Sequence, residues 1–392
     1  MQKPFLHFLP SVLVWVALLL AIPIVSASTP LEDAQVLLNH EQRLYGVQMP
    51  IPALAVGQHQ RFKLQHNYTH AAHVDGDRLY VVSQNRSDHP VIDLLALDDR
   101  AFLEVYQLPE LALIAKTELR TKDVALITSG DGVVYILERE GLVHALSSKD
   151  FTPLRTFHLD NIPESSRFKV QGQKFFVLGS DGVVRIHDLD KSSLVGVIDT
   201  RHDYPERFLS LEPDQRQDTV WDLLAHEDTI YVATSHGAIK RYDRQTLAFL
   251  GQDVFDEGGD RLFPVRALAI SDTHNLLFGL WHIGLGEIDL KSGEWRWLLH
   301  TGQVPVFHGV DKLLSFDHTV VISPMASDRL HFLFPPRGGG FHEEVLTPQA
   351  GDIVALFRYE QMLIAVTEYG MLHLWKMIDE EASFYLQSKQ TP

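Results

Sequence analysis

Three closely spaced histidines are the residues in this sequence best suited to hold a metal ion. The stretch HNYTHAAH contains His66, His70 and His73. On one face of a helix these imidazoles could bind zinc and leave a coordination position open for catalysis, whereas in a loop or strand they would point in different directions. No HExxH motif and no evident carboxylate partner accompanies them. We therefore favour the interpretation without a metal and predict no metal site.

A second group of charged residues follows a run of glycines. The stretch PPRGGG contains Arg337 and leads into FHEEV, with His342, Glu343 and Glu344. The two alternatives are a charged rim loop that contacts a partner and a long connection between strands, and we favour the connection. The glycines do not indicate a phosphate-binding loop, because no Lys-Ser/Thr pair follows them.

A tryptophan and a histidine, Trp281 and His282, occupy a position in LWHIGLG where polar turn residues are expected. The indole could stack on a ligand or pack against a neighbouring side chain, and we favour packing. Acidic turns such as DEGGDR from Asp256 lack the register of oxygen ligands that calcium requires. No GxSxG nucleophile motif or paired-carboxylate motif is evident. The sequence therefore predicts no catalytic residue, no cofactor and a protein that is not an enzyme.

The composition excludes several classes of site and partner. The chain of 392 residues has no cysteine, which rules out disulfides, thiolate metal sites, iron–sulfur clusters and c-type haem attachment. Its formal net charge of −17 repels the phosphates of nucleic acids and of anionic lipid surfaces. We expect a protein partner rather than a nucleic acid.

The N-terminal residues have the layout of a secretory signal peptide. A short polar start is followed by an apolar run over residues 11 to 25 and then by small residues up to Ala27. The run is shorter than the roughly 20 residues that span a bilayer, and Pro23 interrupts it. We predict a signal peptide over residues 1–27, cleavage after Ala27, and no membrane insertion afterwards. An exported protein without cysteine favours a bacterial periplasm.

One sequence phrase recurs along most of the chain. Four apolar residues are followed by a short polar turn and a glycine in VYILEREG, FFVLGSDG, IYVATSHG and LIAVTEYG, which begin at Val134, Phe175, Ile230 and Leu363. Looser copies begin at Leu79, Leu276 and Val320. The mean spacing of about 47 residues is typical of β-propeller blades.

The repeat predicts an all-β propeller over residues 60–378, with seven four-stranded blades as the favoured count and six or eight as alternatives. Each apolar run is expected to form an inner strand buried on both faces, and Gly182, Gly237 and Gly370 are expected to form hairpin turns. A single blade cannot bury its own faces. We expect a segment between Gln60 and Asp77 to complete the final blade, which would close the ring.

Several of these units resemble known propeller repeats. The stretch SDGVVRIHDLDKSSLVGVI resembles a WD-repeat blade, as do SHGAIKRYDRQ and EYGMLHLWKM, with the family's Trp-Asp positions at His187–Asp188, Tyr242–Asp243 and Trp375. The stretch GLGEIDLKSGEWRWLL resembles a quinoprotein-type repeat at Asp289, Gly293 and Trp297. The resemblance implies a propeller fold and a packing role for His187. The histidine and serine of the WD-repeat hydrogen-bond network are not identifiable in most units, so function stays open.

The two ends of the chain lie outside this repeat. Residues 28–59 are predicted to form a short amphipathic helix, starting at an N-cap at Thr29, and a proline-rich linker. Residues 379–392 are assigned to a C-terminal tail.

Two functions are consistent with these features. The favoured function is an exported, non-catalytic protein-interaction scaffold, for example an accessory or assembly factor for an envelope or periplasmic redox enzyme. The alternative is an enzyme or small-ligand receptor with a site at the mouth of the central channel. Three or more His, Asp, Glu or Arg side chains converging there from different blades would favour the alternative.

Overall fold

The computed structural model describes residues 56–85, 100–119, 121, 123–202, 218–255, 263–300, 309–316, 319–324, 327, 329–334, 340–345 and 351–377. The chain divides into Met1–Pro50 and Ile51–Pro392, and every described residue belongs to the second unit. The predicted signal peptide, N-terminal helix and C-terminal tail lie outside the described residues. The one helical segment among the described residues is the 3-10 turn η1 (Thr200–His202). No helix in this part of the chain is long and apolar enough to cross a membrane.

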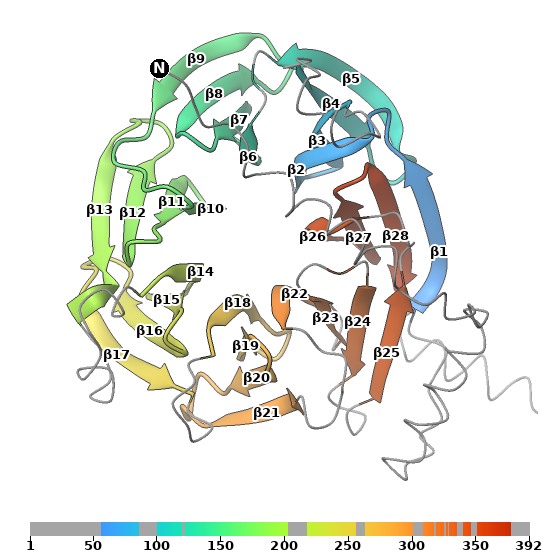
Figure 1. Ribbon diagram of the computed structural model, residues 1–392. Helices are drawn as coiled ribbons and strands as arrows, with labels where there is room; N and C mark the ends of the chain where they lie inside the picture. The colour runs from blue at the N-terminus through green and yellow to red at the C-terminus, as the bar shows by residue number, and fades with distance from the viewer. Residues whose placement is uncertain are drawn as a thin grey trace, which may run out of the picture. The chain divides into compact units, whose positions relative to one another are not determined.

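The described residues form a ring of seven four-stranded antiparallel sheets, a β-propeller (Figure 1). The seven blades, in chain order and from the axis outward, are β2 (Tyr68–Asp75), β3 (Arg78–Gln84), β4 (Ala101–Gln107) and β5 (Ala112–Leu119); β6 (Val124–Gly130), β7 (Val133–Glu138), β8 (Leu142–Ser147) and β9 (Pro153–His158); β10 (Arg167–Gln171), β11 (Lys174–Leu178), β12 (Val183–Asp188) and β13 (Leu194–Asp199); β14 (Val220–His226), β15 (Thr229–Thr234), β16 (Ala238–Asp243) and β17 (Phe249–Val254); β18 (Val265–Ile270), β19 (Leu276–Leu280), β20 (Gly284–Ile288) and β21 (Trp295–His300); β22 (Val310–Phe316), β23 (Thr319–Pro324), β24 (Arg329–Phe334) and β25 (Gly340–Val345); and β26 (Ile353–Tyr359), β27 (Met362–Thr367), β28 (Met371–Met377) and β1 (Val56–Lys63). The predicted fold class and blade count are confirmed.

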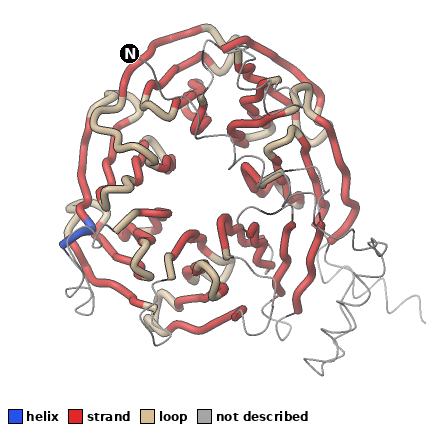
Figure 2. The backbone as a smooth tube through the Cα atoms, in the orientation of Figure 1, coloured by secondary structure: helices blue, strands red, loops and turns tan. Residues whose placement is uncertain are grey.

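The apolar repeat marks the second strand of each blade, counted from the axis. The seven predicted starting points fall one each in β3, β7, β11, β15, β19, β23 and β27. The strands of each blade follow one another outward from the axis (Figure 2), and β10 lies nearer the axis than β11. In β11 the residues from Phe175 to Leu178 are all buried, whereas every residue of β10 is partly exposed. The innermost strand of this blade is therefore more exposed than the strand that follows it.

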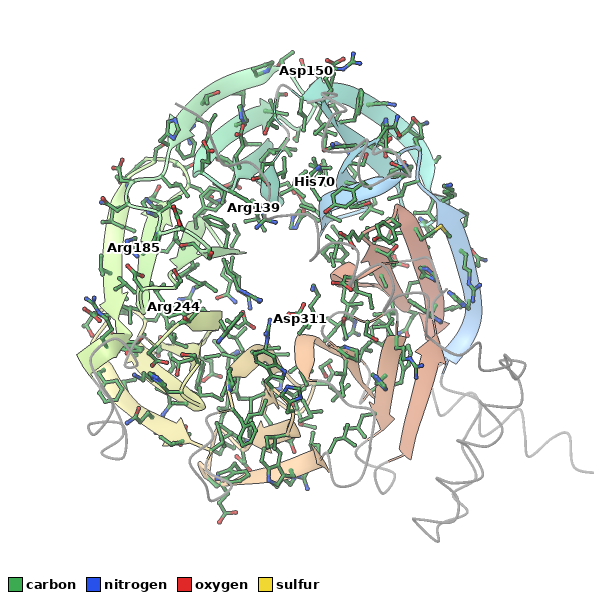
Figure 3. All side chains as sticks on the ribbon, viewed as in Figure 1. His70, Arg139, Asp150, Arg185, Arg244 and Asp311 are labelled. Atoms are coloured by element: carbon green, nitrogen blue, oxygen red, sulfur yellow. The ribbon has the colours of Figure 1, made fainter. Side chains whose placement is uncertain are left out.

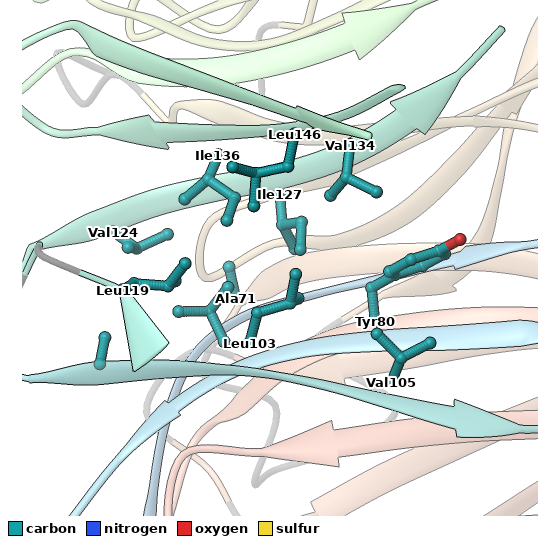
Figure 4. Close-up of a cluster of buried hydrophobic side chains, with 12 residues drawn as sticks. Ala71, Tyr80, Leu103, Val105, Leu119, Val124, Ile127, Val134, Ile136 and Leu146 are labelled. Atoms are coloured by element: carbon teal, nitrogen blue, oxygen red, sulfur yellow. The ribbon is translucent and has the colours of Figure 1, made fainter. Parts of the chain in front are cut away.

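The hydrophobic core lies between the blades rather than within them. In one cluster, Tyr80 and Leu103 of the first blade pack with Ile127 and Ile136 of the second, and all four are at most 2% exposed (Figure 4). Each sheet thus depends on its neighbours to remove its apolar faces from water.

The ring is closed by strands from opposite ends of the described chain. β1 pairs antiparallel with β28 and forms the outermost strand of the last blade, as predicted, although it begins at Val56 rather than after Gln60. His59 of β1 lies 3.0 Å from His373 of β28 between Nε2 and Nδ1, and it stacks on Trp375 with a centroid separation of 4.6 Å.

The predicted turn glycines adopt backbone angles that other residues avoid. Gly182, Gly237 and Gly370 have φ of +77°, +70° and +69°. A Cβ atom on Gly370 would also overlap the carbonyl oxygen of His66, in the loop that leads from β1 into β2. Gly370 therefore permits the last blade to approach the first.

We predict that Gly370→Ala destabilises the protein more than Gly293→Ala. Gly293 has a similar φ of +75°, but a Cβ there would have no neighbour within 4 Å. The control should cost about 1 kcal/mol and Gly370→Ala about 3 kcal/mol, because overlap with a neighbouring backbone adds to the cost of the left-handed conformation. Urea unfolding measures both, and equal costs would contradict close packing at this junction.

A buried lysine forms an ion pair within the fourth blade and a hydrogen bond to the end of the third. Lys240 is fully buried, with Nζ 3.2 Å from Oδ2 of Asp218 and 2.5 Å from the carbonyl oxygen of Thr200. The backbone N–H of His236 donates to Asp218 Oδ1 at 3.1 Å. Burial opposes ionisation of Asp218, but His236 and Lys240 outweigh it and hold the pKa of the carboxyl below its usual value.

Removing one partner of this pair should cost more than removing both charges. Lys240→Met leaves the Asp218 carboxylate buried without its cation and should destabilise the protein by about 3–5 kcal/mol. The double variant Asp218→Asn/Lys240→Met should regain most of that loss. A double variant as unstable as Lys240→Met would show that packing, rather than charge, dominates at this position.

Candidate functional site

The structure gives His66, His70 and His73, the three histidines considered as metal ligands, separate surroundings. Nδ1 of His66 lies 2.7 Å from Glu104 Oε1, while Nε2 of His70 lies 2.7 Å from Gln84 Oε1. His73 sits further along β2, and burial lowers its pKa. No three His, Cys, Asp or Glu side chains among the described residues are arranged to hold a metal ion. The histidines therefore act singly in the described structure.

His66 contacts a serine and a carboxylate that lie far from it in the sequence. Its Nδ1 lies 3.0 Å from Ser83 Oγ as well as close to Glu104, and its Nε2 lies 3.2 Å from Lys116 Nζ. A catalytic triad requires the serine and the carboxylate on opposite ring nitrogens. Here both contact the same nitrogen, and Ser83 and Glu104 are fully buried. The arrangement is a structural contact between the connection that enters the first blade and the strands β3 and β4 of that blade.

Most of the other residues singled out in the sequence lie on strands or are buried. The stretch FHEEV lies on β25 rather than in a loop or connection, because its backbone pairs with β24; Arg337 lies outside the described residues. His187 on β12 is fully buried, as expected of a packing residue, and burial lowers its pKa. Trp281 contributes to the cluster described next.

The strands nearest the axis carry a repeated irregularity. In six of the seven blades the innermost strand has a bulge close to its first residue, and the bulged residues are His70, Ala125, Trp221, Arg266, Asp311 and Val354. Bulges re-aim side chains and are common beside functional sites. Because each lies at the start of an innermost strand, all six belong to one end of the ring, and His70 and Asp311 lie close to its centre (Figure 3).

Cationic and aromatic side chains from four blades gather at this end. We call them the axial cluster, and its members are Arg167, Trp221, Arg266, Trp281, Asp311 and Lys312. The guanidinium carbon of Arg266 lies 4.1 Å from the ring centroid of Trp221 and 5.1 Å from that of Trp281. Arg167 stacks on the same Trp221 ring at 4.5 Å. One indole thus contacts two cations.

Three cations of the axial cluster share one carboxylate. Asp311 lies 2.6 Å from Lys312 Nζ, 3.4 Å from Arg266 Nη2 and 3.8 Å from Arg167 Nη1. Burial disfavours the charged form of Asp311, but Lys312 and the two arginines outweigh it, so the pKa of the carboxyl is lowered. The cluster keeps an excess of positive charge in a protein whose formal net charge is −17.

Three hydrogen-bond donors of the axial cluster have no acceptor among the described residues. They are Nε of Arg266 and the indole Nε1 atoms of Trp221 and Trp281. Arg266 is only 4% exposed. Buried donors without acceptors cost free energy, and native proteins retain such arrangements mainly at functional sites. The arrangement is suited to receive an anionic or acceptor-rich group.

Neighbouring polar groups hold the inner strands together beneath the cluster. Lys169 Nζ contacts Asp222 Oδ1 at 2.6 Å, and Asp222 Oδ2 accepts the backbone N–H of Leu268 at 2.8 Å. These contacts join three blades and satisfy a backbone donor on the open edge of an innermost strand.

The sequence carried a signal for the axial cluster. Trp221, Arg266 and Asp311 recur every 45 residues, and each follows a fully buried valine at the start of an innermost strand. The blade period therefore marks these positions, but their different side-chain types conceal the repeat.

Two further surface features involve residues outside the axial cluster. A cavity of about 390 Å³ is lined by Arg139 and Glu140 together with residues 162–166. The outermost strands β13 and β17 expose large apolar side chains, between 40% and 56% exposed, and these are Leu194, Val195, Val197, Phe249 and Leu250.

Comparisons with known proteins identify the fold alone. No family model matches the sequence, and none of the curated proteins matches it. Among solved structures, the computationally designed Ika8 protein is similar with a TM-score of 0.54 and 12% sequence identity, over 80% of this chain and 98% of that one.

Buried histidines should make the protein sensitive to acid. Burial, and then Arg329, lower the pKa of His331 to about 4. The unfolded chain binds this proton below about pH 6.5 and the folded chain does not, so stability falls as the pH drops from 6.5 to 4. His331→Gln should reduce that loss by about 3 kcal/mol in urea unfolding measured across this range. An unchanged pH dependence would contradict a neutral buried imidazole.

Proposed function

We propose that this protein is an exported, non-catalytic scaffold that holds a protein partner at the end of the ring occupied by the axial cluster. The observation that carries the proposal is the stacking of two arginines, Arg167 and Arg266, on the one indole of Trp221, because arginine and tryptophan dominate protein-binding hot spots. Three residues of the cluster, Trp221, Arg266 and Asp311, are bulged residues of innermost strands.

The chemistry of the axial cluster favours binding over catalysis. Its carboxylate, Asp311, is surrounded by cations that lower its pKa, which makes it a weak general base near neutral pH. The cluster contains no serine, cysteine or histidine to act as a nucleophile or proton shuttle. Arginine and tryptophan are the residue types that dominate binding hot spots.

The outer surface supports a protein as the partner. Val195 on β13 and Leu250 on β17 are 48% and 56% exposed, and they belong to neighbouring blades. Exposed apolar side chains on adjacent elements are typical of protein interfaces. The predicted signal peptide and the absence of cysteine favour a role as an accessory or assembly factor for an envelope or periplasmic redox enzyme.

A small-ligand receptor is the second candidate function. Arg167, Arg266 and Asp311 come from three different blades, which meets the criterion stated above for a site at the mouth of the channel. The same residues would then hold a free anion rather than a segment of a protein.

Charge reversal in the axial cluster should abolish the complex with the partner. Arg167 and Lys312 have partly exposed side chains, at 39% and 30%, so Arg167→Glu/Lys312→Glu should leave the fold intact. Tagged mature protein is recovered from its own host, and the co-purifying protein is quantified. We expect at least a tenfold loss of that protein with the double variant.

The matched control is Lys149→Glu/Lys174→Glu, which changes the net charge equally at two exposed positions outside the cluster, a turn residue and the first residue of β11. This control should retain the complex, and both double variants should keep the thermal midpoint of the parent. Retention of the partner by the axial variant, or equal loss in both variants, would overturn the proposed docking site.

A further inference from the structure

A pair of carboxylates continues the charged end of the ring into the last blade. The backbone N–H of Glu368, directly after β27, donates to the carbonyl oxygen of Asp352, directly before β26, at 2.8 Å. The same backbone contact joins Arg139 to Asp123 in the second blade at 3.0 Å. The two pairs therefore occupy equivalent positions in the propeller.

The side chains at these equivalent positions differ in charge. In the second blade Arg139 Nε lies 3.0 Å from Asp123 Oδ1, which is an ordinary surface ion pair. In the last blade a glutamate, Glu368, replaces the arginine, so two carboxylates lie together. Burial and then Glu368 raise the pKa of Asp352, although Lys312 acts in the opposite direction.

The carboxylate pair and the axial cluster face the same end of the ring. Asp352 precedes the first residue of β26, as Gly309 precedes β22, whose second residue is Asp311. Lys312 and Asp311 both influence the ionisation of Asp352. This end of the ring thus presents cations from the third, fifth and sixth blades, followed by two carboxylates from the seventh.

We infer that this end of the ring recognises a dipolar peptide segment of the partner, with an acidic side chain on the axial cluster and a basic side chain at Asp352 and Glu368. The inference rests on the proposed function and specifies its partner. The buried donors of Arg266, Trp221 and Trp281 mark where the acidic group is needed.

Long-range charge favours a dipolar segment over a polyanion. The formal net charge of −17 repels a strongly acidic segment before it reaches the axial cluster. A segment with one acidic and one basic side chain avoids this repulsion and still pairs with both groups of opposite charge.

Calorimetry with short peptides tests this recognition. The probes are acetylated, amidated glycine hexapeptides with one glutamate and one lysine, and two controls in which glutamine replaces either charged residue. A fourth probe, 6-aminohexanoate, carries the same charges as a free small molecule. We expect the dipolar peptide to bind at least tenfold more tightly than each single-charge peptide and than 6-aminohexanoate.

Two variants assign the charges to their sites. Asp352→Asn/Glu368→Gln should reduce the affinity for the dipolar peptide to that of the glutamate-only peptide, while Arg167→Ala should weaken both glutamate-containing peptides. Lys149→Ala serves as the exposed control and should change none of the affinities.

Three results would overturn the inference. The first is that the dipolar peptide binds no more tightly than the single-charge peptides. The second is that its preference survives Asp352→Asn/Glu368→Gln. The third is that 6-aminohexanoate binds more tightly than the dipolar peptide, which would assign the site to a free ligand. If the native complex still requires Arg167 and Lys312 while the peptides show no preference, the dipolar partner is wrong and the proposed function stands. If the native complex does not require Arg167 and Lys312 and the peptides also show no preference, the proposed function is wrong as well.

Discussion

The closure of the ring is the constraint on which the rest of the structure depends. Each sheet has two apolar faces, and the buried clusters join residues of neighbouring blades, as Tyr80 joins Ile127. A missing contact at any junction would expose two such faces to water. The pairing of β1 with β28 prevents this by supplying the last strand from the opposite end of the described chain. The axial cluster depends on the same closure, because its members come from four separate blades.

The bulges convert a repetitive scaffold into a site with individual chemistry. A regular innermost strand would alternate its side chains between the two blade interfaces, whereas a bulge turns one residue away from this alternation. Buried valines such as Val220, Val265 and Val310 anchor each strand, and the next residue is then free to vary. Six blades have the bulge. Only in one arc of the ring, formed by the fourth, fifth and sixth blades, does the bulged residue belong to the axial cluster. The unsatisfied donors of this arc cost stability, which agrees with our proposal that the arc binds a partner.

The sequence predicts the architecture of this protein more completely than its site. Apolar second strands and turn glycines repeat because every blade solves the same packing problem, so the blade count and the closure can be predicted from spacing. Trp221, Arg266 and Asp311 share a position but no chemistry, and each is unremarkable within its own segment. His66, Ser83 and Glu104 are far apart in the chain and meet only when the first blade is complete. FHEEV was misassigned because its glycine-rich, charged composition resembles a connection, whereas pairing with β24 makes it a strand.

Above all, we propose that the partner binds at the axial end of the ring. Hydrogen exchange of the mature protein, measured by mass spectrometry with and without its co-purifying partner, tests this claim most directly. We predict slower exchange at the first residues of β10, β14, β18 and β22 and around Asp352 and Glu368 in the complex. Slower exchange confined to the outer strands β13 and β17, with the axial segments unchanged, would contradict it.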